Sequence, residues 1–363
     1  MSNNWAMDTA SYDLGQNGRH DIGGKSATSA IGYRENLPVD APKSLISCDL
    51  PLPELGSHDL LVEVEAVSVN PVDVKLRANA PATGPGAVDG FRVLGFDAAG
   101  TVVRAGDEVT LFSSGDRVFY AGSIDRPGTN RRLHAVDERI VGKMPASLSF
   151  ADAASLPLTA ITAWESLFDR LELTSESEGV LLVVGATGGV GSIMLQLAEE
   201  LLPKVTVIAT ASDPERARWA RELGAEYTVN HREDLAEQVS RIAPGGVQWL
   251  FTAHSEGQIP TYAQIVAPFG HIVAIDDGAR DVEPLKSACI AWHWEFMFTR
   301  PRLADSTAQH ELLGRIADLV DSGRLRPTVT KELSPVNPEN LREAHRLVES
   351  GRTLGKIVLA GWV

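Results

Sequence analysis

The sequence predicts an α/β protein with a β-rich first domain and a second domain built on a doubly wound parallel sheet. Short β-like runs between turns fill most of residues 31–145. From about residue 181, strand-like and helix-like runs alternate, which is typical of a parallel sheet with helices on both faces. The chain has 363 residues, which suits two domains better than one unusually large unit.

In the first domain, the clearest strand is Leu60–Val69. Its apolar residues alternate with Glu63 and Glu65, the period of a half-buried strand. Further strands are expected in residues 92–103 and 118–120, so this domain is all-β or barrel-like. Helical spacing takes over in SFADAASLPLTAITAWESLF, which predicts a domain boundary near residue 150.

The stretch Leu181–Leu202 (LLVVGATGGVGSIMLQLAEELL) predicts a buried strand, a tight glycine turn and an amphipathic helix. Glycines let a backbone approach a diphosphate, and the helix N-terminus supplies free N–H groups and a positive dipole end. The turn predicts a dinucleotide site, and an empty strand–turn–helix is the alternative. The next strand, 206–210, follows at βαβ spacing and favours the dinucleotide. The residues expected to contact it are Ala186, Thr187, Gly188, Gly189, Val190 and Gly191.

The rest of the chain continues both patterns. Strands are expected at 226–230, 247–252 and 271–275, and helices at 214–223 and 235–242. Beyond residue 302 the predicted elements are helices at 308–322 and 338–350, an extended run at 326–333 and a strand at 356–359. Because those last strands must be buried somewhere, we expect the tail to return to the first domain.

The composition excludes several classes of protein. The net charge of −15 disfavours binding to nucleic acid or to an anionic membrane. The two cysteines have no paired spacing, and we find neither a membrane-spanning run nor a signal core, so we expect a soluble cytoplasmic protein. Residues 1–29 are rich in Ser, Asn, Gly and Asp, and predict a flexible or loosely docked extension.

Four segments together resemble the medium-chain dehydrogenase/reductase superfamily, and in particular its zinc-free quinone oxidoreductases. They are VSVNPVDVKLRA, VLGFDAAGTVVRAGDEVTLFSSGDRVFYAG, AASLPLTAITAWESLF and GATGGVG. The resemblance implies a GroES-like catalytic domain from residues 30–151 and 303–363, a Rossmann domain from 152–302, and an active site in the cleft between them. It also implies a homodimer joined through the Rossmann sheet.

A metal site is not expected. Zinc-dependent relatives place a Cys and a His-Glu pair where this chain has Asn70 and Phe96-Asp97. A phenylalanine ring offers no lone pair, and one carboxylate cannot hold a catalytic zinc ion, which needs about three protein ligands.

NADPH is favoured over NADH as the coenzyme. The second strand of the Rossmann unit ends at Ser212 without the carboxylate that usually holds the NAD ribose. By resemblance, Arg216 and His231 flank the 2′-phosphate, and an Arg fork suits that group. Two alternatives stay open: Asp213 could hold a ribose, and Arg216 could pair with Glu215 or Glu222 on the helix surface. The predicted cofactor-binding residues outside the glycine turn are Ser212, Arg216, His231, Thr159 and Lys356.

The predicted catalytic residues are Asn70 and Asp73, placed by resemblance at the nicotinamide end of the cleft, and Lys75. The Lys75 ammonium could donate a proton or attract the substrate, and the alternative is a solvated surface lysine. Thr159 could instead be a helix-capping threonine. Tyr120 and His293 are expected to line the substrate pocket, although His293 lies in an aromatic run (HWEFMF) that also suits a domain or dimer boundary.

These residues predict an enzyme that uses NADPH and no zinc to reduce quinones or α,β-unsaturated carbonyls by hydride transfer. Such acceptors take hydride with only hydrogen-bond stabilisation of the developing oxyanion. The alternatives are a zinc-dependent alcohol dehydrogenase and a non-catalytic, crystallin-like protein that binds nucleotide or RNA. The expected partner is a small-molecule quinone or enone.

Overall fold

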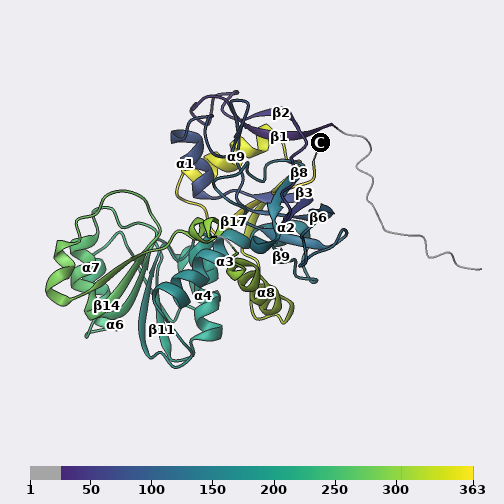
Figure 1. Ribbon diagram of the computed structural model, residues 1–363. Coiled ribbons are helices and arrows are strands. Elements are labelled where there is room, and N and C mark those ends of the chain that lie inside the picture. Colours follow the sequence, from purple (N-terminus) through teal and green to yellow (C-terminus); the bar gives the residue numbers. More distant parts are fainter. Residues whose placement is uncertain (1–25, 304, 363) are drawn as a thin grey trace, which may run out of the picture.

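The computed structural model describes residues 26–303 and 305–362, in two lobes that meet near helix α3 and strand β17 (Figure 1). Most of the predicted N-terminal extension lies outside the described residues. Its last three residues do not fit that prediction, because strand β1 (Ala27–Tyr33) begins at Ala27 and pairs antiparallel with β2 (Ile46–Pro51). The Thr28 hydroxyl also accepts a hydrogen bond from Leu133 N at 3.1 Å. These contacts order the residues that composition alone had assigned to the extension.

The first lobe contains two antiparallel-rich sheets. A four-stranded sheet has the order β2-β1-β5-β4, and a seven-stranded sheet has the order β16-β17-β3-β6-β7-β9, with β8 paired to β3. Strand β17 pairs antiparallel with β3, so the C-terminal tail returns to the first domain, as predicted. The remaining bounds are β3 (Asp59–Ser68), β4 (Ala87–Val88), β5 (Phe91–Val93), β6 (Ala98–Ala105), β7 (Arg117–Tyr120), β8 (Leu133–Asp137), β9 (Gly142–Lys143), β16 (Val329–Leu333) and β17 (Lys356–Ala360).

The second lobe is a six-stranded parallel sheet in the order β12-β11-β10-β13-β14-β15. Counted along the chain within this sheet, the order is 3-2-1-4-5-6, that of a dinucleotide-binding doubly wound fold. The prediction of this sheet is confirmed, with one addition: β15, in the aromatic run, is its outer strand. The bounds are β10 (Gly179–Val184), β11 (Val205–Thr210), β12 (Tyr227–Val229), β13 (Val247–Thr252), β14 (Val266–Ala274) and β15 (Ala291–Trp294).

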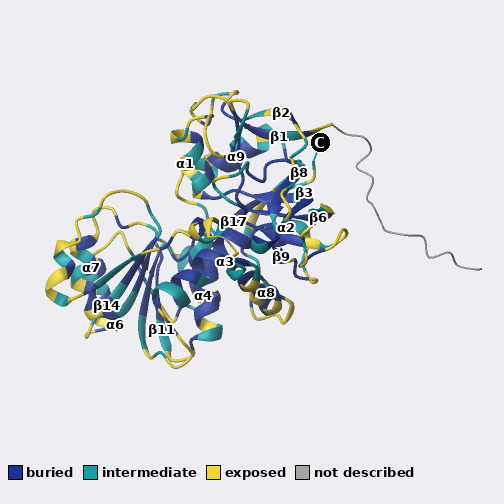
Figure 2. Cartoon of the chain, viewed as in Figure 1, coloured by how far each residue is buried: buried dark blue, intermediate teal, exposed yellow. Residues whose placement is uncertain are grey.

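Helices cover both faces of the parallel sheet, and most residues of its four central strands, β10, β11, β13 and β14, are buried (Figure 2). On β10, Leu181 and Val183 pack into one cluster with α4, whereas Leu182 packs into another with α6 and α7. This division follows from the two-residue repeat of a strand. The helices are α1 (Pro71–Asn79), α2 (Phe150–Ala154), α3 (Pro157–Trp164), α4 (Gly189–Leu201), α5 (Pro214–Glu222), α6 (Leu235–Ile242), α7 (Ile259–Ile265), α8 (Ala308–Asp321) and α9 (Pro338–Glu349), with short turns η1 (Glu138–Ile140), the π-helix η2 (Glu165–Arg170), η3 (Glu283–Ala288) and η4 (Met297–Arg302). The exact limits of the two domains stay a prediction.

Two buried carboxyl groups fix the segment that leaves the parallel sheet after β15. Glu165 pairs with Arg300 and Glu295 pairs with Arg170, and each glutamate side chain is 1% exposed. Burial, and then the neighbouring Glu295, raise the pKa of Glu165 to about 9. The folded protein therefore retains a proton here that the unfolded chain releases above about pH 4.3.

A pH-dependent stability follows from this carboxyl pair. Because the folded state binds the extra proton, stability falls as pH rises through the window from about 4.3 to 9. Stability should therefore fall between pH 7 and 9, and Glu165→Gln should reduce that slope. Urea unfolding at both pH values measures it, with the exposed Glu176→Gln as control. Equal slopes in wild type and Glu165→Gln would contradict the assignment.

Candidate functional site

In the glycine turn between β10 and α4, the backbone lies very close to neighbouring parts of the chain. Gly185 has a φ of +86°, a conformation that favours glycine. A Cβ on Gly191 would lie 2.5 Å from both Ala186 Cα and the Gly185 carbonyl oxygen. A Cβ on Gly189 would lie 2.8 Å from Lys356 Cδ and 2.9 Å from Thr159 Cγ2. Backbone conformation at position 185 and packing at positions 189 and 191 therefore favour glycine.

The N-terminus of α4 is open to a ligand. Its N-cap is Gly188, and no side chain among the described residues caps it. A Cβ on Gly188 would meet no described atom nearer than the Gly185 oxygen at 3.6 Å, so there is room beside the first N–H groups. The strand order reverses between β10 and β13, and doubly wound sheets bind ligands at this point, outside the carboxyl ends of the strands. The turn fits the diphosphate of a dinucleotide.

A buried polar cluster lies against this turn and contains Asn70, Asp97 and Lys356, which are 1%, 0% and 4% exposed. The Lys356 ammonium donates to Asn70 Oδ1 at 2.6 Å and to Asp97 Oδ2 at 3.1 Å. Asn70 Nδ2 donates to Asp97 Oδ2 at 2.7 Å. The Lys356 stem is the one that lies beside Gly189, so a single side chain joins the glycine turn to the cluster.

Asp73 supports the cluster from within helix α1. Asn70 is the N-cap of α1, and Asp73 Oδ2 accepts from the Asn70 backbone N–H at 2.9 Å. Asp73 Oδ1 accepts from Gly95 N at 2.8 Å. Burial raises the pKa of Asp73 to about 7, although both backbone donors act in the opposite direction. The structure thus brings the two predicted residues Asn70 and Asp73 together, with Asp73 bonded to backbone.

The donor set of this cluster does not fit a catalytic zinc ion. Phe96 is buried and has no donor atom, and the Asp97 carboxylate already pairs with a lysine ammonium. Among residues 26–303 and 305–362, no group of three or more His, Cys, Asp and Glu side chains is placed to hold a metal. A positively charged side chain therefore lies beside the carboxylate of this cluster, where a metal ion would have to bind.

The end of strand β11 forms a basic corner. Arg216 lies one turn into α5, and its guanidinium donates to the Arg352 carbonyl oxygen and pairs with Asp213 at 3.3 Å. Burial lowers the pKa of His231, and positive neighbours that include Arg216 lower it further. Arg216 does not pair with Glu222, whose partner is Arg218.

At the end of β11, both oxygens of the Asp213 carboxylate accept hydrogen bonds from neighbouring residues. Its Oδ1 accepts from Arg216 N at 2.9 Å as the N-cap of α5, and its Oδ2 accepts from Ser212 Oγ at 3.1 Å. Hydrogen bonding to Arg216 N is the main cause that lowers the pKa of Asp213. The predicted residues Ser212, Arg216 and His231 therefore gather at the carboxyl ends of adjacent strands.

Two further predicted residues lie near the cluster, in different settings. Thr159 is 2% exposed, and its hydroxyl donates to the Leu156 oxygen at 3.0 Å inside α3, so only its methyl group faces Gly189. Lys75 is half exposed and pairs with Asp277 at 2.7 Å, which links α1 to the loop after β14. A role for either residue in binding or catalysis stays a prediction.

The two predicted substrate-pocket residues do not join the cluster. Tyr120 is 0% exposed, and its ring stacks on His134, to which its hydroxyl is hydrogen-bonded at 3.1 Å. It cannot line an open pocket, because strand β7 turns it into the core. His293 lies on the outer strand β15, with its ring stacked on His271. His293 therefore lies at a sheet edge, and the alternative of a domain or dimer boundary stays a prediction.

Asp97 was recognised in the sequence only as an incomplete zinc ligand. A signal was available, because Asp97 is the one charged residue in the apolar run VLGFDAAG, and a buried carboxylate needs partners.

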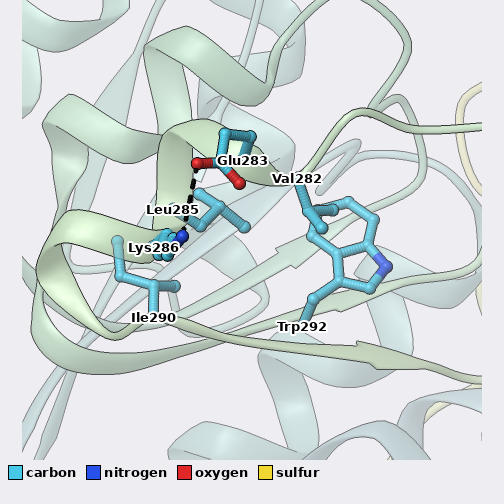
Figure 3. Close-up of a pocket in the computed structure, with 6 residues that line it drawn as sticks. All are labelled: Val282, Glu283, Leu285, Lys286, Ile290 and Trp292. Carbon is cyan, nitrogen blue, oxygen red and sulfur yellow. Dashed lines mark ion pairs between the residues drawn. The ribbon is translucent and has the colours of Figure 1, made fainter.

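A hollow of about 300 Å³ lies elsewhere, beside β15 and η3, and Figure 3 shows Trp292 facing Val282 and the Glu283–Lys286 ion pair. That hollow contains none of the predicted site residues.

The chain matches known proteins over nearly all of its described length. Residues 56–149 match the model of the alcohol dehydrogenase GroES-like domain, and residues 223–359 match that of the zinc-binding dehydrogenases. A zinc-type alcohol dehydrogenase-like protein of Staphylococcus aureus (strain COL) is 42% identical over 85% of this chain and 92% of its own length. The 2-methylene-furan-3-one reductase of Solanum lycopersicum is 28% identical, over 92% of this chain and 79% of its own length.

Among solved structures, a protein of Rhizobium etli CFN 42 described as a candidate zinc-dependent alcohol dehydrogenase is 46% identical. The match covers 93% of this chain and 99% of that one, with a TM-score of 0.88. The described residues contain no helix with the length and apolarity that a membrane crossing requires. With its GroES-like and Rossmann domains, the chain belongs to the medium-chain dehydrogenase/reductase superfamily, and is an oxidoreductase whose fold binds a nicotinamide coenzyme.

Proposed function

We propose that this protein uses NADPH to reduce quinones or α,β-unsaturated carbonyl compounds, without zinc. The observation that carries the proposal is the Lys356 side chain, whose stem lies against the glycine turn and whose ammonium bonds Asn70 and Asp97. Beyond the glycine turn, the proposed coenzyme site therefore ends at a buried ion pair and amide whose orientation is fixed without a metal. Fixed dipoles of this kind can stabilise charge that develops nearby without reorganising.

The residues of this chain would divide the work between binding and polarisation. The first turn of α4 would hold the diphosphate, and Arg216 with His231 would hold the 2′-phosphate. When bound, NADPH would supply a hydride to the electrophilic carbon of the acceptor. The Lys356–Asp97 ion pair and the amide of Asn70 would line the nicotinamide end of the site, and Lys75 would attract a carbonyl or anionic acceptor.

The names of the relatives agree that these proteins are oxidoreductases, but they name different substrates. The Solanum lycopersicum protein is called a reductase of a methylene-furanone, which is a conjugated carbonyl compound. The Staphylococcus aureus and Rhizobium etli proteins carry zinc and alcohol dehydrogenase in their descriptions. We favour the first activity because the donor set around Asp97 does not suit zinc.

The direct test is a panel of acceptors. Purified protein is assayed with 1,2-quinones, 1,4-quinones and short enones, with NADPH and NADH side by side. We expect NADPH-dependent reduction of at least one quinone or enone and no oxidation of simple alcohols. Alcohol oxidation with no reduction of any quinone or enone would contradict the proposal.

Arg216→Ala should change the coenzyme preference. If the guanidinium binds the 2′-phosphate, the loss of a charge-assisted contact lowers kcat/KM for NADPH by about 10- to 100-fold. The value for NADH, which lacks this phosphate, should change little. Arg218→Ala is the matched control, since Arg218 lies two residues further along the same helix and pairs with Glu222. Equal losses with NADPH and NADH would show that Arg216 does not read the phosphate.

We also propose a homodimer joined through the outer strand of the parallel sheet. Strand β15 ends the sheet, and Trp294 and the adjacent Phe296 are 48% and 44% exposed. Exposed aromatic side chains on an open sheet edge are typical of an interface. Sedimentation at micromolar concentration should give the mass of two chains, and Trp294→Glu should give one. A wild-type monomer at that concentration would contradict this assembly.

A further inference from the structure

Asp97 lies at a junction of four chain segments. Its Oδ2 accepts from Ser68 Oγ and Asn70 Nδ2, both at 2.7 Å, and from Lys356 Nζ at 3.1 Å. Its Oδ1 accepts from Leu158 N at 2.7 Å. These donors come from the end of β3, the N-cap of α1, the start of β17 and the first turn of α3. Since Asp97 is 0% exposed, it can act only through these neighbours.

The network fixes which way the Asn70 amide points. Its Oδ1 accepts from the Lys356 ammonium, and its Nδ2 donates to Asp97 and, at 3.3 Å, to the Phe96 oxygen. A rotated amide would place its NH₂ group against the ammonium and its oxygen against the carboxylate, and both contacts would repel. Asp97 and Lys356 together therefore hold one orientation.

The network also fixes the Lys356 charge. All three ammonium protons have acceptors, because Val69 O accepts at 3.3 Å in addition to Asn70 and Asp97. An ammonium that is 4% exposed needs a carboxylate beside it, and Asp97 is the one with which it pairs. The charge is thereby held at the end of the glycine turn, next to Gly189.

We infer that Asp97 is a positioning residue for hydride transfer, acting through the Asn70 amide and the Lys356 ammonium. This inference rests on the proposed function. Positioning of this kind matters because small displacements of the groups that face a reacting centre cost rate even when binding is retained. Asp97 does not contact the substrate, and its contribution is orientation and charge balance.

Asp97→Asn keeps the shape of the side chain and removes its charge. We expect kcat to fall by about 10- to 100-fold. The primary isotope effect with NADPH deuterated at the transferred position should rise, because hydride transfer becomes more limiting. The Kd for NADPH in calorimetry should change little, because the glycine turn and Arg216 are unaltered. A milder variant, Ser68→Ala, removes one donor to Asp97 and should lower kcat by about 2- to 10-fold with the same isotope signature.

A double-mutant cycle distinguishes positioning from simple support. If Asp97 acts partly through Asn70, the loss of rate in the double variant Asn70→Ala with Asp97→Asn should be smaller than the two single losses combined. Asp59→Asn is the matched control, since Asp59 is also a buried carboxylate, bonded to Gly56 N and to Arg126. It should lower the melting temperature and leave kcat unchanged.

The outcomes separate the two proposals. Additive losses in the cycle would overturn the role of Asp97 while the proposed function stands. The same conclusion would follow if kcat fell in both Asp97→Asn and Ser68→Ala with an unchanged isotope effect. If the folded wild-type protein reduced none of the quinones or enones with NADPH, the proposed function would be overturned, and the role of Asp97 with it.

Discussion

Lys356→Met is expected to lower kcat/KM with NADPH by about 100-fold or more. Methionine keeps an apolar stem against Gly189, but it removes the ammonium that bonds Asn70 and Asp97. Asp97 then remains buried with no positive partner, and breaking a buried ion pair in this way costs about 3 kcal/mol of folding stability. Steady-state kinetics and urea unfolding measure the two effects.

The control for Lys356→Met lies on the next strand. Lys331 on β16 is half exposed and pairs with Glu343 at 3.5 Å, so Lys331→Met should change stability by less than about 1 kcal/mol and leave kcat/KM unaltered. If Lys356→Met retained activity within a few-fold of wild type, the ammonium would have no part in catalysis.

Gly191→Ala is expected to abolish most NADPH binding. The added Cβ would lie 2.5 Å from Ala186 Cα and from the Gly185 oxygen, and neither backbone atom can move without distorting the turn. Overpacking of this kind costs about 1–3 kcal/mol of stability. Because the same turn presents the N–H groups of α4, affinity for NADPH should fall by more than about 10-fold. Calorimetry and thermal unfolding would check both effects.

Gly314 provides a matched control for Gly191 inside another helix, α8. No described atom lies within 4 Å of a Cβ built on Gly314. Gly314→Ala should therefore stabilise the protein slightly, by about 0.5–1 kcal/mol, and leave NADPH binding unchanged. Equal NADPH affinity in Gly191→Ala and Gly314→Ala would show that the turn does not hold the coenzyme.

Much of the fold could be predicted from hydrophobic period and turn chemistry. The predicted bounds of helices α6 and α8 and of strand β13 lie within one residue of their observed ends. In α6 this follows from a strong apolar period and from Asp234, which caps the helix N-terminus. The sequence predicts no strand at β15, where it indicates only an aromatic run that suits a domain or dimer boundary. Its residues are part exposed, so the sequence lacks the alternation that marks a half-buried strand.

The site was harder to predict, because its geometry depends on segments far apart in the chain. Asn70 and Lys356 are 286 positions apart and yet bonded, and no local pattern carries that contact. Tyr120 was misplaced because a buried tyrosine on a strand has the same local sequence as one that lines a pocket. Asp97 was undervalued because its role depends on donors from four segments.

The most direct test of the account compares metal content with the rate of reduction. Elemental analysis of pure protein is followed by exhaustive chelation, and NADPH oxidation with an accepted quinone or enone is measured before and after. We predict far less than one zinc ion per chain and an unchanged rate. One zinc ion per chain, with a rate that falls on chelation and returns on adding zinc, would contradict the account.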